Sequence, residues 1–221
     1  MLARLRTTVL LLAASMATRA VANGIQQSDF SGIGHIYVLK SDNWKSATPE
    51  SVVGCLDTDG KFVAEKSTSH ECADFSRLED FPWTLSTERG NCTFEDAKQE
   101  KNTDSYYGKG DHAWSCGERV TDIYDELYTI DGFPYVFLCF GDVACYYDAK
   151  RTPKDHEALP LWPFRWGSHQ MGITPGHVQL QLMWKKIGEL PKKSLASDML
   201  GPRVQISDQV QIPLLGKKVS G

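Results

Sequence analysis

Six cysteines constrain the fold of this 221-residue chain more than any other feature. All six lie between residues 55 and 145, and an even number of cysteines in an oxidising compartment is typical of a disulfide framework. The count alone leaves the connectivity open, and pairing between sequence neighbours is the favoured arrangement. The predicted bonds are Cys55–Cys72, Cys92–Cys116 and Cys139–Cys145. A metal-binding role for these cysteines is disfavoured, because the chain has no CxxC motif.

The third predicted bond constrains the backbone between its two cysteines. Residues 137–145 are predicted to form two strands joined around Gly141-Asp142. With a loop of residues 141–143, Cys139 and Cys145 lie directly opposite each other and their side chains share a face. A shorter loop of residues 141–142 would turn Cys145 to the other face. The bond therefore predicts the longer loop.

The N-terminus has the features of a secretion signal. Arg4 and Arg6 precede a short apolar run over residues 9–17, and the small-x-small sequence over residues 20–22 matches a signal-peptidase site. The apolar run is too short to span a bilayer, which takes ~20 residues. Residues 1–22 are therefore predicted to be a signal peptide. The mature protein is predicted to be secreted, extracellular and without a membrane anchor.

The charge of the mature chain argues against nucleic acid as its main partner. Removing residues 1–22 removes three arginines and no acidic residue, so the formal net charge changes from −4 to −7. Binding to a phosphate backbone needs a basic stripe, which a mildly acidic chain does not readily supply. Composition also divides the chain: residues 23–189 are predicted to form a single β domain. Residues 190–221, which contain no aromatic residue, are predicted to form a flexible C-terminal tail.

Most of the domain has the residue pattern of β-strands. Short segments rich in β-branched and aromatic residues are bounded by Gly, Asp and Asn. The predicted extended segments are 35–41, 53–64 with a turn at Asp59-Gly60, 83–95 with a turn at 88–91, 122–149 as a three-stranded meander, 161–168, and 177–187. Residues 97–112 are predicted to form a loop, or a short helix followed by a loop. The pattern predicts an all-β or β-dominated fold, a disulfide-stapled antiparallel β-sandwich or barrel.

Residues 91–93 have the acceptor sequence for an N-linked glycan, and a cysteine lies inside it. Both roles can be met if Arg89-Gly90 forms a turn and the next strand begins at Cys92. Strand alternation then places Asn91 at an exposed turn edge, Cys92 inward toward its disulfide and Thr93 outward. Asn91 is therefore a predicted glycosylation site.

The histidines and acidic residues do not form a recognisable catalytic or metal motif. No HxH or HExxH spacing occurs, so no metal and no other cofactor is predicted. Residues 57–60 resemble the start of a calcium loop, but the Gly and Glu that must follow are absent, and a hairpin turn explains these residues better. Ser168 and His169 are sequence neighbours, which point to opposite sides of a strand and cannot act as a nucleophile and its base. No catalytic residue is assigned.

A secreted ribonuclease remains an alternative. It needs a general base, a general acid and a cation that stabilises the transition state. The residues that could supply them are His112, Glu118, Arg119, Arg165 and His169. Their spacing does not require that they meet, and polar surface residues on separate loops are the competing interpretation.

The segment 161–168 is rich in aromatic residues. In an extended conformation Trp162, Phe164 and Trp166 lie on one face, with Arg165 on the other. Such rings could form a platform for a sugar or a peptide, whereas the favoured interpretation is that they face the core. Pro163 cannot donate a hydrogen bond to a neighbouring strand, which predicts an edge strand or an extended loop.

A secretion signal, a disulfide framework and abundant Trp and Tyr resemble the small secreted cysteine-rich proteins of filamentous fungi, many of which are effector candidates. The sequence "DHAWSCGE" over residues 111–118, with a cysteine upstream, is similar to a stretch of the Alternaria major-allergen family of secreted β-barrels. The resemblance covers about a tenth of the chain and implies an extracellular β-fold. It implies no residue roles.

Together these features predict a secreted, disulfide-rich, non-enzymatic binding protein that acts, like an effector, on a host protein or a cell-wall polysaccharide. Two alternatives remain. One is a carbohydrate-binding protein in which Trp162 and Trp166 are exposed and coplanar. The other is a secreted hydrolase or ribonuclease.

Overall fold

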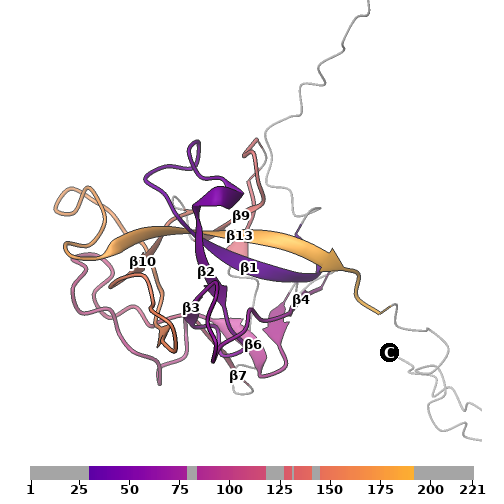
Figure 1. The fold of residues 1–221 in the computed structure, drawn as a ribbon. Helices are drawn as coiled ribbons and strands as arrows, with labels where there is room; N and C mark the ends of the chain where they lie inside the picture. Colours follow the sequence, from indigo (N-terminus) through magenta and orange to yellow (C-terminus); the bar gives the residue numbers. More distant parts are fainter. Residues whose placement is uncertain (1–29, 79–83, 118–126, 131, 141–144, 192–221) are drawn as a thin grey trace, which may run out of the picture. The chain divides into compact units, whose positions relative to one another are not determined.

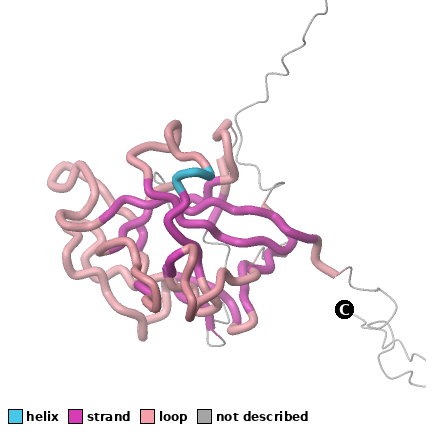
Figure 2. The backbone as a smooth tube through the Cα atoms, in the orientation of Figure 1, coloured by secondary structure: helices cyan, strands magenta, loops and turns pink. Residues whose placement is uncertain are grey.

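The computed structural model describes residues 30–78, 84–117, 127–130, 132–140 and 145–191. In chain order, the elements are β1 (Gly32–Lys40), η1 (Pro49–Ser51), β2 (Val52–Leu56), β3 (Phe62–Ala64), β4 (Phe75–Arg77), β5 (Leu85–Thr87), β6 (Gly90–Thr93), β7 (Ser115–Gly117), β8 (Leu127–Tyr128), β9 (Phe137–Phe140), β10 (Tyr147–Ala149), β11 (Ala158–Leu159), β12 (Trp162–Pro163) and β13 (Val178–Gly188). All of these except the short 3-10 turn η1 are strands (Figure 2), so the all-β prediction is confirmed.

The sheet is built around the long antiparallel ribbon of β1 and β13 (Figure 1). Along its other edge β1 pairs with β2 and β4, and β13 pairs along its other edge with β9 and β10. The remaining strands extend the sheet in the order β11-β3-β2-β1-β4-β5-β6-β7. The result is one curled antiparallel sheet in the form of a half-barrel, stapled by disulfides as predicted.

The alternation of β13 sets the position of the core. Leu180, Leu182 and Trp184 share one face of the strand and are buried in the main hydrophobic cluster, as their period of two predicts. Met183 lies on the opposite face and packs into a smaller cluster with Leu39. The middle of β13 is therefore covered on both faces.

The three disulfides join neighbours in sequence, as predicted. The bonds are Cys55–Cys72, Cys92–Cys116 and Cys139–Cys145. The second bond links residues that lie directly opposite each other on β6 and β7. It closes the base of the long connection that carries residues 94–114.

The predicted three-stranded meander is only partly correct. β8 and β9 pair antiparallel, as a hairpin requires. β9 and β10, however, both run antiparallel to β13, so they follow each other in the same direction along one edge of it. The chain advances nine residues from Leu138 to Tyr147 while β13 advances two, from Leu182 to Leu180. The third disulfide thus closes a loop that interrupts one continuous edge, not a hairpin.

The β2–β3 hairpin has the predicted turn, whereas the second strand of the β5–β6 hairpin begins two residues earlier than predicted. In the second hairpin Thr87 pairs with Gly90, and the strand already begins at Gly90, whose φ of +127° suits a glycine. Asn91 is consequently half-buried in a strand that pairs on both sides, not at a turn edge. Thr93 is buried, which contradicts the expectation that it points outward. Glycosylation of Asn91 stays a prediction.

The connection between β6 and β7 contains no helix, so the loop alternative for residues 97–112 is confirmed. Several predicted features lie outside the described residues: the signal peptide 1–22, the tail 190–221 from residue 192 onward, and the loop 141–143. The division into a domain of residues 23–189 and a tail stays a prediction. Among the described residues, no helix is of the length and hydropathy that crossing a bilayer requires.

Candidate functional site

Two loops carry the most exposed large hydrophobic side chains of the described chain. One loop, residues 101–112, precedes β7, and the other, residues 164–177, precedes β13; both lie on the same side of the sheet (Figure 1). Tyr106 and Trp166 are 61% and 52% exposed, and Met171 is 84% exposed. We call these three residues, together with Tyr107 and His169, the aromatic loop surface.

Ring contacts join the two loops at this surface. The ring of His169 stacks on Tyr106 with a centroid distance of 5.0 Å, and Tyr106 meets Tyr107 edge-on at 4.9 Å. Gly167 lies against the ring of Tyr107, where a Cβ atom would come within 2.5 Å of the ring. This close approach therefore requires a glycine beside Trp166.

The hydroxyl of Tyr107 connects three polar groups at the surface. It lies 3.2 Å from Ser168 Oγ and 3.1 Å from His169 Nδ1, and it accepts the backbone N–H of His169. The hydrogen bond with Ser168, and after it the one from the backbone N–H of His169, lower the pKa of the Tyr107 phenol. Ser168 Oγ also lies 3.1 Å from His169 Nδ1, contrary to the prediction that these neighbours diverge. They converge because residues 167–170 form a tight turn and not a strand.

A buried polar network holds both loops from beneath. Gln170 accepts the backbone N–H of Tyr106 at 2.5 Å and the hydroxyl of Ser105 at 3.3 Å. Asn102 accepts the backbone N–H of Ser105 and donates to the carboxylate of Asp148 on β10. Because these groups are buried and satisfied, they anchor the loops at Asn102, Ser105 and Tyr106 and at Gln170. The two loops are thus tied to each other and to β10 at these points.

Sequence reasoning missed this network. Its anchors come from segments far apart in the chain, and no short motif unites them. One signal was present: Asp148 is a single acid between Tyr147 and Ala149 in a strand that is buried along its whole length. A charge at such a position requires partners.

The alternative of an aromatic platform over residues 162–166 is not met, whereas the favoured core-facing interpretation holds for Trp162. Trp162 is fully buried, its Nε1 donates to the carbonyl of Glu100, and its ring stacks on His177. Phe164 is partly buried against Tyr146. The expectation that Trp162 is exposed beside Trp166 is therefore wrong.

The reason lies in the length of the strand. β12 contains only residues 162–163 and pairs with β10, so the alternation that would have put three rings on one face ends after Pro163. The other predicted residue of this segment, Arg165, pairs with Asp111 at 2.5 Å and lies over the ring of Phe140.

The candidate ribonuclease residues that the structure describes each have other partners. Arg165 is paired with Asp111, His169 with Tyr107 and Ser168, and His112 lies in a β-bridge with Lys101. Among the described residues no contact joins His112, Arg165 and His169. The remaining two members, Glu118 and Arg119, lie outside the described residues.

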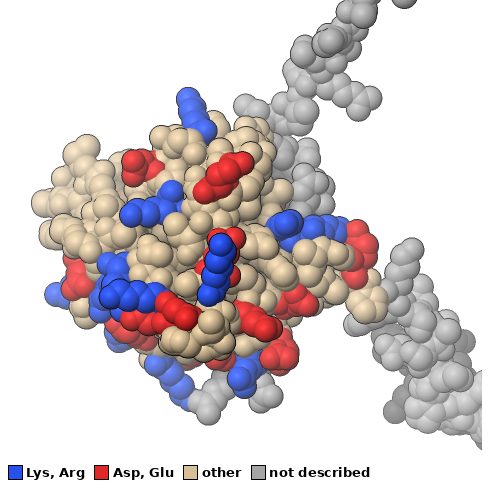
Figure 3. Space-filling view, viewed as in Figure 1, with Lys and Arg blue, Asp and Glu red and all other residues tan. Residues whose placement is uncertain are grey.

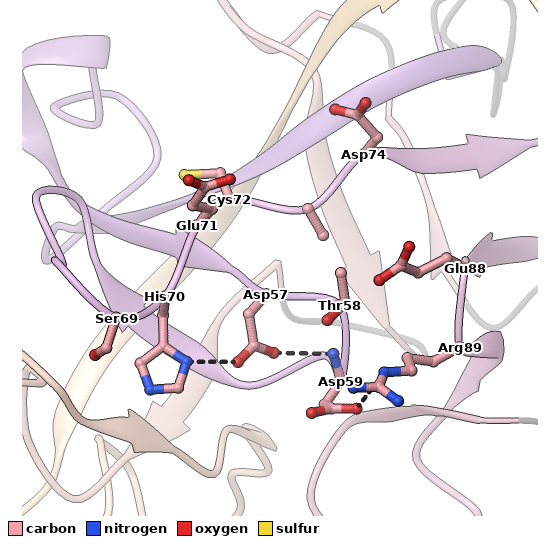
Figure 4. A pocket seen from close by; sticks show the side chains of 11 residues that line it. Asp57, Thr58, Asp59, Ser69, His70, Glu71, Cys72, Asp74, Glu88 and Arg89 are labelled. Carbon is pink, nitrogen blue, oxygen red and sulfur yellow. Dashed lines mark hydrogen bonds and ion pairs between the residues drawn. The ribbon is translucent and has the colours of Figure 1, made fainter.

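A polar cleft of about 640 Å³ is lined by residues outside the aromatic loop surface (Figure 4). Its walls are the β2–β3 turn, residues 69–74 beside the first disulfide, and the β5–β6 turn. The carboxylates that line it are Asp57, Asp59, Glu71, Asp74 and Glu88, against the basic side chains of His70 and Arg89. Its charge is therefore mainly negative.

Asp57 has a structural role in this cleft. Its Oδ1 accepts the backbone N–H groups of Asp59 at 3.0 Å and Lys61 at 2.8 Å, and its Oδ2 lies 3.6 Å from Nδ1 of His70 (Figure 4). Residues 57–60 thus form the predicted hairpin turn. Within the described parts of the chain, no three His, Cys, Asp or Glu residues are placed to hold a metal ion.

The environment of Asp57 leads to a prediction about pH. Burial raises the pKa of its carboxyl, so ionising it costs more in the folded than in the unfolded state. Stability should therefore fall as pH rises from the unfolded-state pKa through the raised one. Asp57→Asn keeps the acceptor oxygen and is expected to flatten this dependence, whereas Asp57→Ala leaves two backbone N–H groups unpaired and costs about 1–3 kcal/mol. Urea unfolding between pH 3 and 8 (roughly the range in which carboxyls titrate) checks both variants; an unchanged profile in Asp57→Asn contradicts the prediction.

A second, mostly apolar groove of about 490 Å³ adjoins the β1–β13 ribbon, where Tyr37, Val52, Tyr135 and Met183 are among its lining residues. Basic and acidic side chains are interspersed on the face of the molecule shown in Figure 3, without a continuous basic stripe on that face.

Comparison with known proteins does not assign a family. No family model matches the chain, and neither a curated protein nor a solved structure matches it. The candidate site is therefore interpreted from its own chemistry.

Proposed function

We propose that this chain is a secreted, disulfide-stapled protein that binds another protein through the aromatic loop surface and does not catalyse a reaction. The observation that carries the proposal is the exposure of Tyr106, Trp166 and Met171 on two loops whose backbones are held by a buried polar network. Exposed Trp, Tyr and Met are the side chains most enriched at protein interfaces. Because this network already restrains the loops, less conformational entropy is lost on binding than for free loops.

The disulfides support the secreted part of the proposal. Three bonds account for all six cysteines, and such frameworks form and persist in oxidising compartments. The signal peptide 1–22 and the likeness to fungal secreted proteins, many of them effector candidates, belong to the same proposal. In that setting the partner is a host protein.

A protein partner is favoured over a polysaccharide by the arrangement of the rings. A sugar platform needs flat ring faces open to solvent. Trp162 is buried, and one face of Tyr106 is covered by His169. The adjacent Met171 offers a flexible apolar contact that adapts to a protein surface.

The proposal is tested by removing the surface without disturbing the core. Immobilised mature protein is presented with extracellular host-protein extracts and, separately, with chitin, glucan and cellulose. The double variant Tyr106→Ala/Trp166→Ala is expected to lose at least about tenfold in affinity for a captured protein, because interface aromatics are frequent hot spots. Tyr135→Ala/Ile187→Ala, which removes two other exposed side chains, is the matched control and should bind like the wild type.

Each alternative result has a distinct meaning. Polysaccharide binding that the double variant loses would replace the proposal with the carbohydrate alternative. Protein capture that is equal in wild type and double variant would show that the aromatic loop surface is not the binding site.

A further inference from the structure

His177 lies between two carboxylates at the base of the aromatic loop surface. Its Nδ1 is 2.5 Å from Oδ1 of Asp148, and its Nε2 is 3.1 Å from Oδ2 of Asp104. Asp148 is 1% exposed, and the side chain of His177 is 4% exposed. Asp104 lies at the surface, on the loop that carries Tyr106 and Tyr107. One imidazole thus connects this loop to β10 and to the start of β13.

The hydrogen-bond requirements of this arrangement depend on the protonation of the imidazole. A carboxylate accepts hydrogen bonds, and an imidazole donates from both nitrogens only when it is protonated. A neutral imidazole has one N–H and therefore satisfies one carboxylate, while its other nitrogen presents a lone pair to the second.

The buried carboxylate determines which contact is kept when the imidazole is neutral. Asp148 also accepts from Thr174 Oγ1 and from Asn102 Nδ2, and it has no access to water that could replace a lost donor. Leaving a buried charge short of a donor is costly, whereas Asp104 can be solvated. The remaining proton therefore stays on Nδ1, and the contact with Asp104 is the one that is lost.

We infer that Asp104, His177 and Asp148 form a pH-sensitive latch that orders the loop of residues 101–112 when His177 carries both protons. Only the effect of the latch on binding rests on the proposed function, because the loop carries two residues of the aromatic loop surface. A latched loop loses less conformational entropy on binding, so binding is stronger when His177 is doubly protonated than when it is neutral.

The other groups around His177 are compatible with a loop that is ordered when His177 is doubly protonated. Trp162 on β12 stacks on the ring of His177 and shields it from solvent. Lys150, which pairs with Glu100, is the cation that acts on Asp104 besides His177. The hydrogen bond from His177 lowers the pKa of Asp104. The contribution of Asp104 is therefore present above its unfolded-state pKa and is lost only as pH falls through the lowered value.

Hydrogen exchange of the full mature chain tests the latch without a partner. Exchange of amides in residues 101–112 is measured from about pH 5 to pH 8, the range in which histidines ordinarily titrate, and is corrected for the intrinsic pH dependence. The titration midpoint of His177 comes from its ring ¹⁵N chemical shifts. We expect the protection of the loop to fall roughly five- to tenfold across that midpoint, as one hydrogen bond is lost.

Asp104→Asn separates the latch from a general effect of pH. The new amide can donate to the unprotonated Nε2 of His177, so the loop should stay protected at the high end of the range. Asp74→Asn is the matched control, because Asp74 also pairs with a histidine, His35, but lies in the polar cleft. It should leave the profile of residues 101–112 unchanged.

Two results would overturn the latch. One is loop protection that does not change across the midpoint of His177, and the other is an Asp104→Asn variant that keeps the wild-type profile. Neither result depends on a partner. Conversely, the alanine variants at Tyr106 and Trp166 test the binding surface whether or not the latch exists, so the two proposals fail independently.

Discussion

Trp162→Ala is expected to lower the free energy of unfolding by about 3–5 kcal/mol, whereas Trp166→Ala should change it by less than about 0.5 kcal/mol. The two tryptophans lie four residues apart, on the same face if the segment were extended. In the structure Trp162 is fully buried and Trp166 is 52% exposed.

The cost at Trp162 has two sources. Removing the indole leaves a cavity among buried side chains, since interiors are close-packed and relax only partly. It also removes the donor to the carbonyl of Glu100 and uncovers one face of His177. Trp166→Ala leaves no comparable cavity and removes few contacts, because the Trp166 ring already contacts solvent.

Denaturant unfolding of both variants at one pH checks the difference. The midpoint should fall for Trp162→Ala at an unchanged slope, and Trp162→Phe should recover part of the loss by refilling the site. A Trp162→Ala cost as small as that of Trp166→Ala would contradict the burial of Trp162 and restore the platform of residues 162–166.

This pair also shows where inference from sequence ends. Alternation predicts a shared face only while the chain stays extended, and β12 contains two residues. In β13, which contains eleven residues, the alternation persists, and Leu180, Leu182 and Trp184 share the core face. Strand alternation thus holds in the long strand β13 and ends in β12 where the chain leaves the extended conformation.

Local features were predicted best. The turn at Asp59-Gly60 and the three neighbour disulfides depend on residues close in sequence, and all are present. The course of β9 and β10 depends on their shared partner, β13, which follows them by some thirty residues. A hairpin and an interrupted edge look alike in the sequence of residues 137–145, and only the pairing with β13 distinguishes them.

The candidate site depends still more on distant contacts. Tyr106 and Trp166 were both visible as aromatic residues, but their exposure follows from the loops that carry them. Asp104, Asp148 and His177 belong to separate segments, and each has an ordinary surface interpretation when taken alone. Only the fold brings these groups within hydrogen-bonding distance of one another.

Removing the disulfides one at a time should destabilise the fold in the order of the loops they close. The bonds Cys92–Cys116, Cys55–Cys72 and Cys139–Cys145 have sequence separations of 24, 17 and 6. The loop-entropy relation then gives losses of about 3.4, about 3.1 and about 2.2 kcal/mol, because longer closed loops restrict the unfolded chain more. Paired Cys→Ala variants, unfolded in urea without reductant, measure the three values.

The disulfide with the largest expected loss, Cys92–Cys116, also affects the aromatic loop surface. The bond between Cys92 and Cys116 joins directly paired residues of β6 and β7, and residues 101–112 lie within the loop that it closes. Cys92→Ala/Cys116→Ala should therefore raise hydrogen exchange in residues 101–112 as well as lower stability. Cys55→Ala/Cys72→Ala, with a similar entropic cost, should lower stability without this local effect. Equal exchange in both variants would mean that the buried network beneath the loops fixes them without the disulfide.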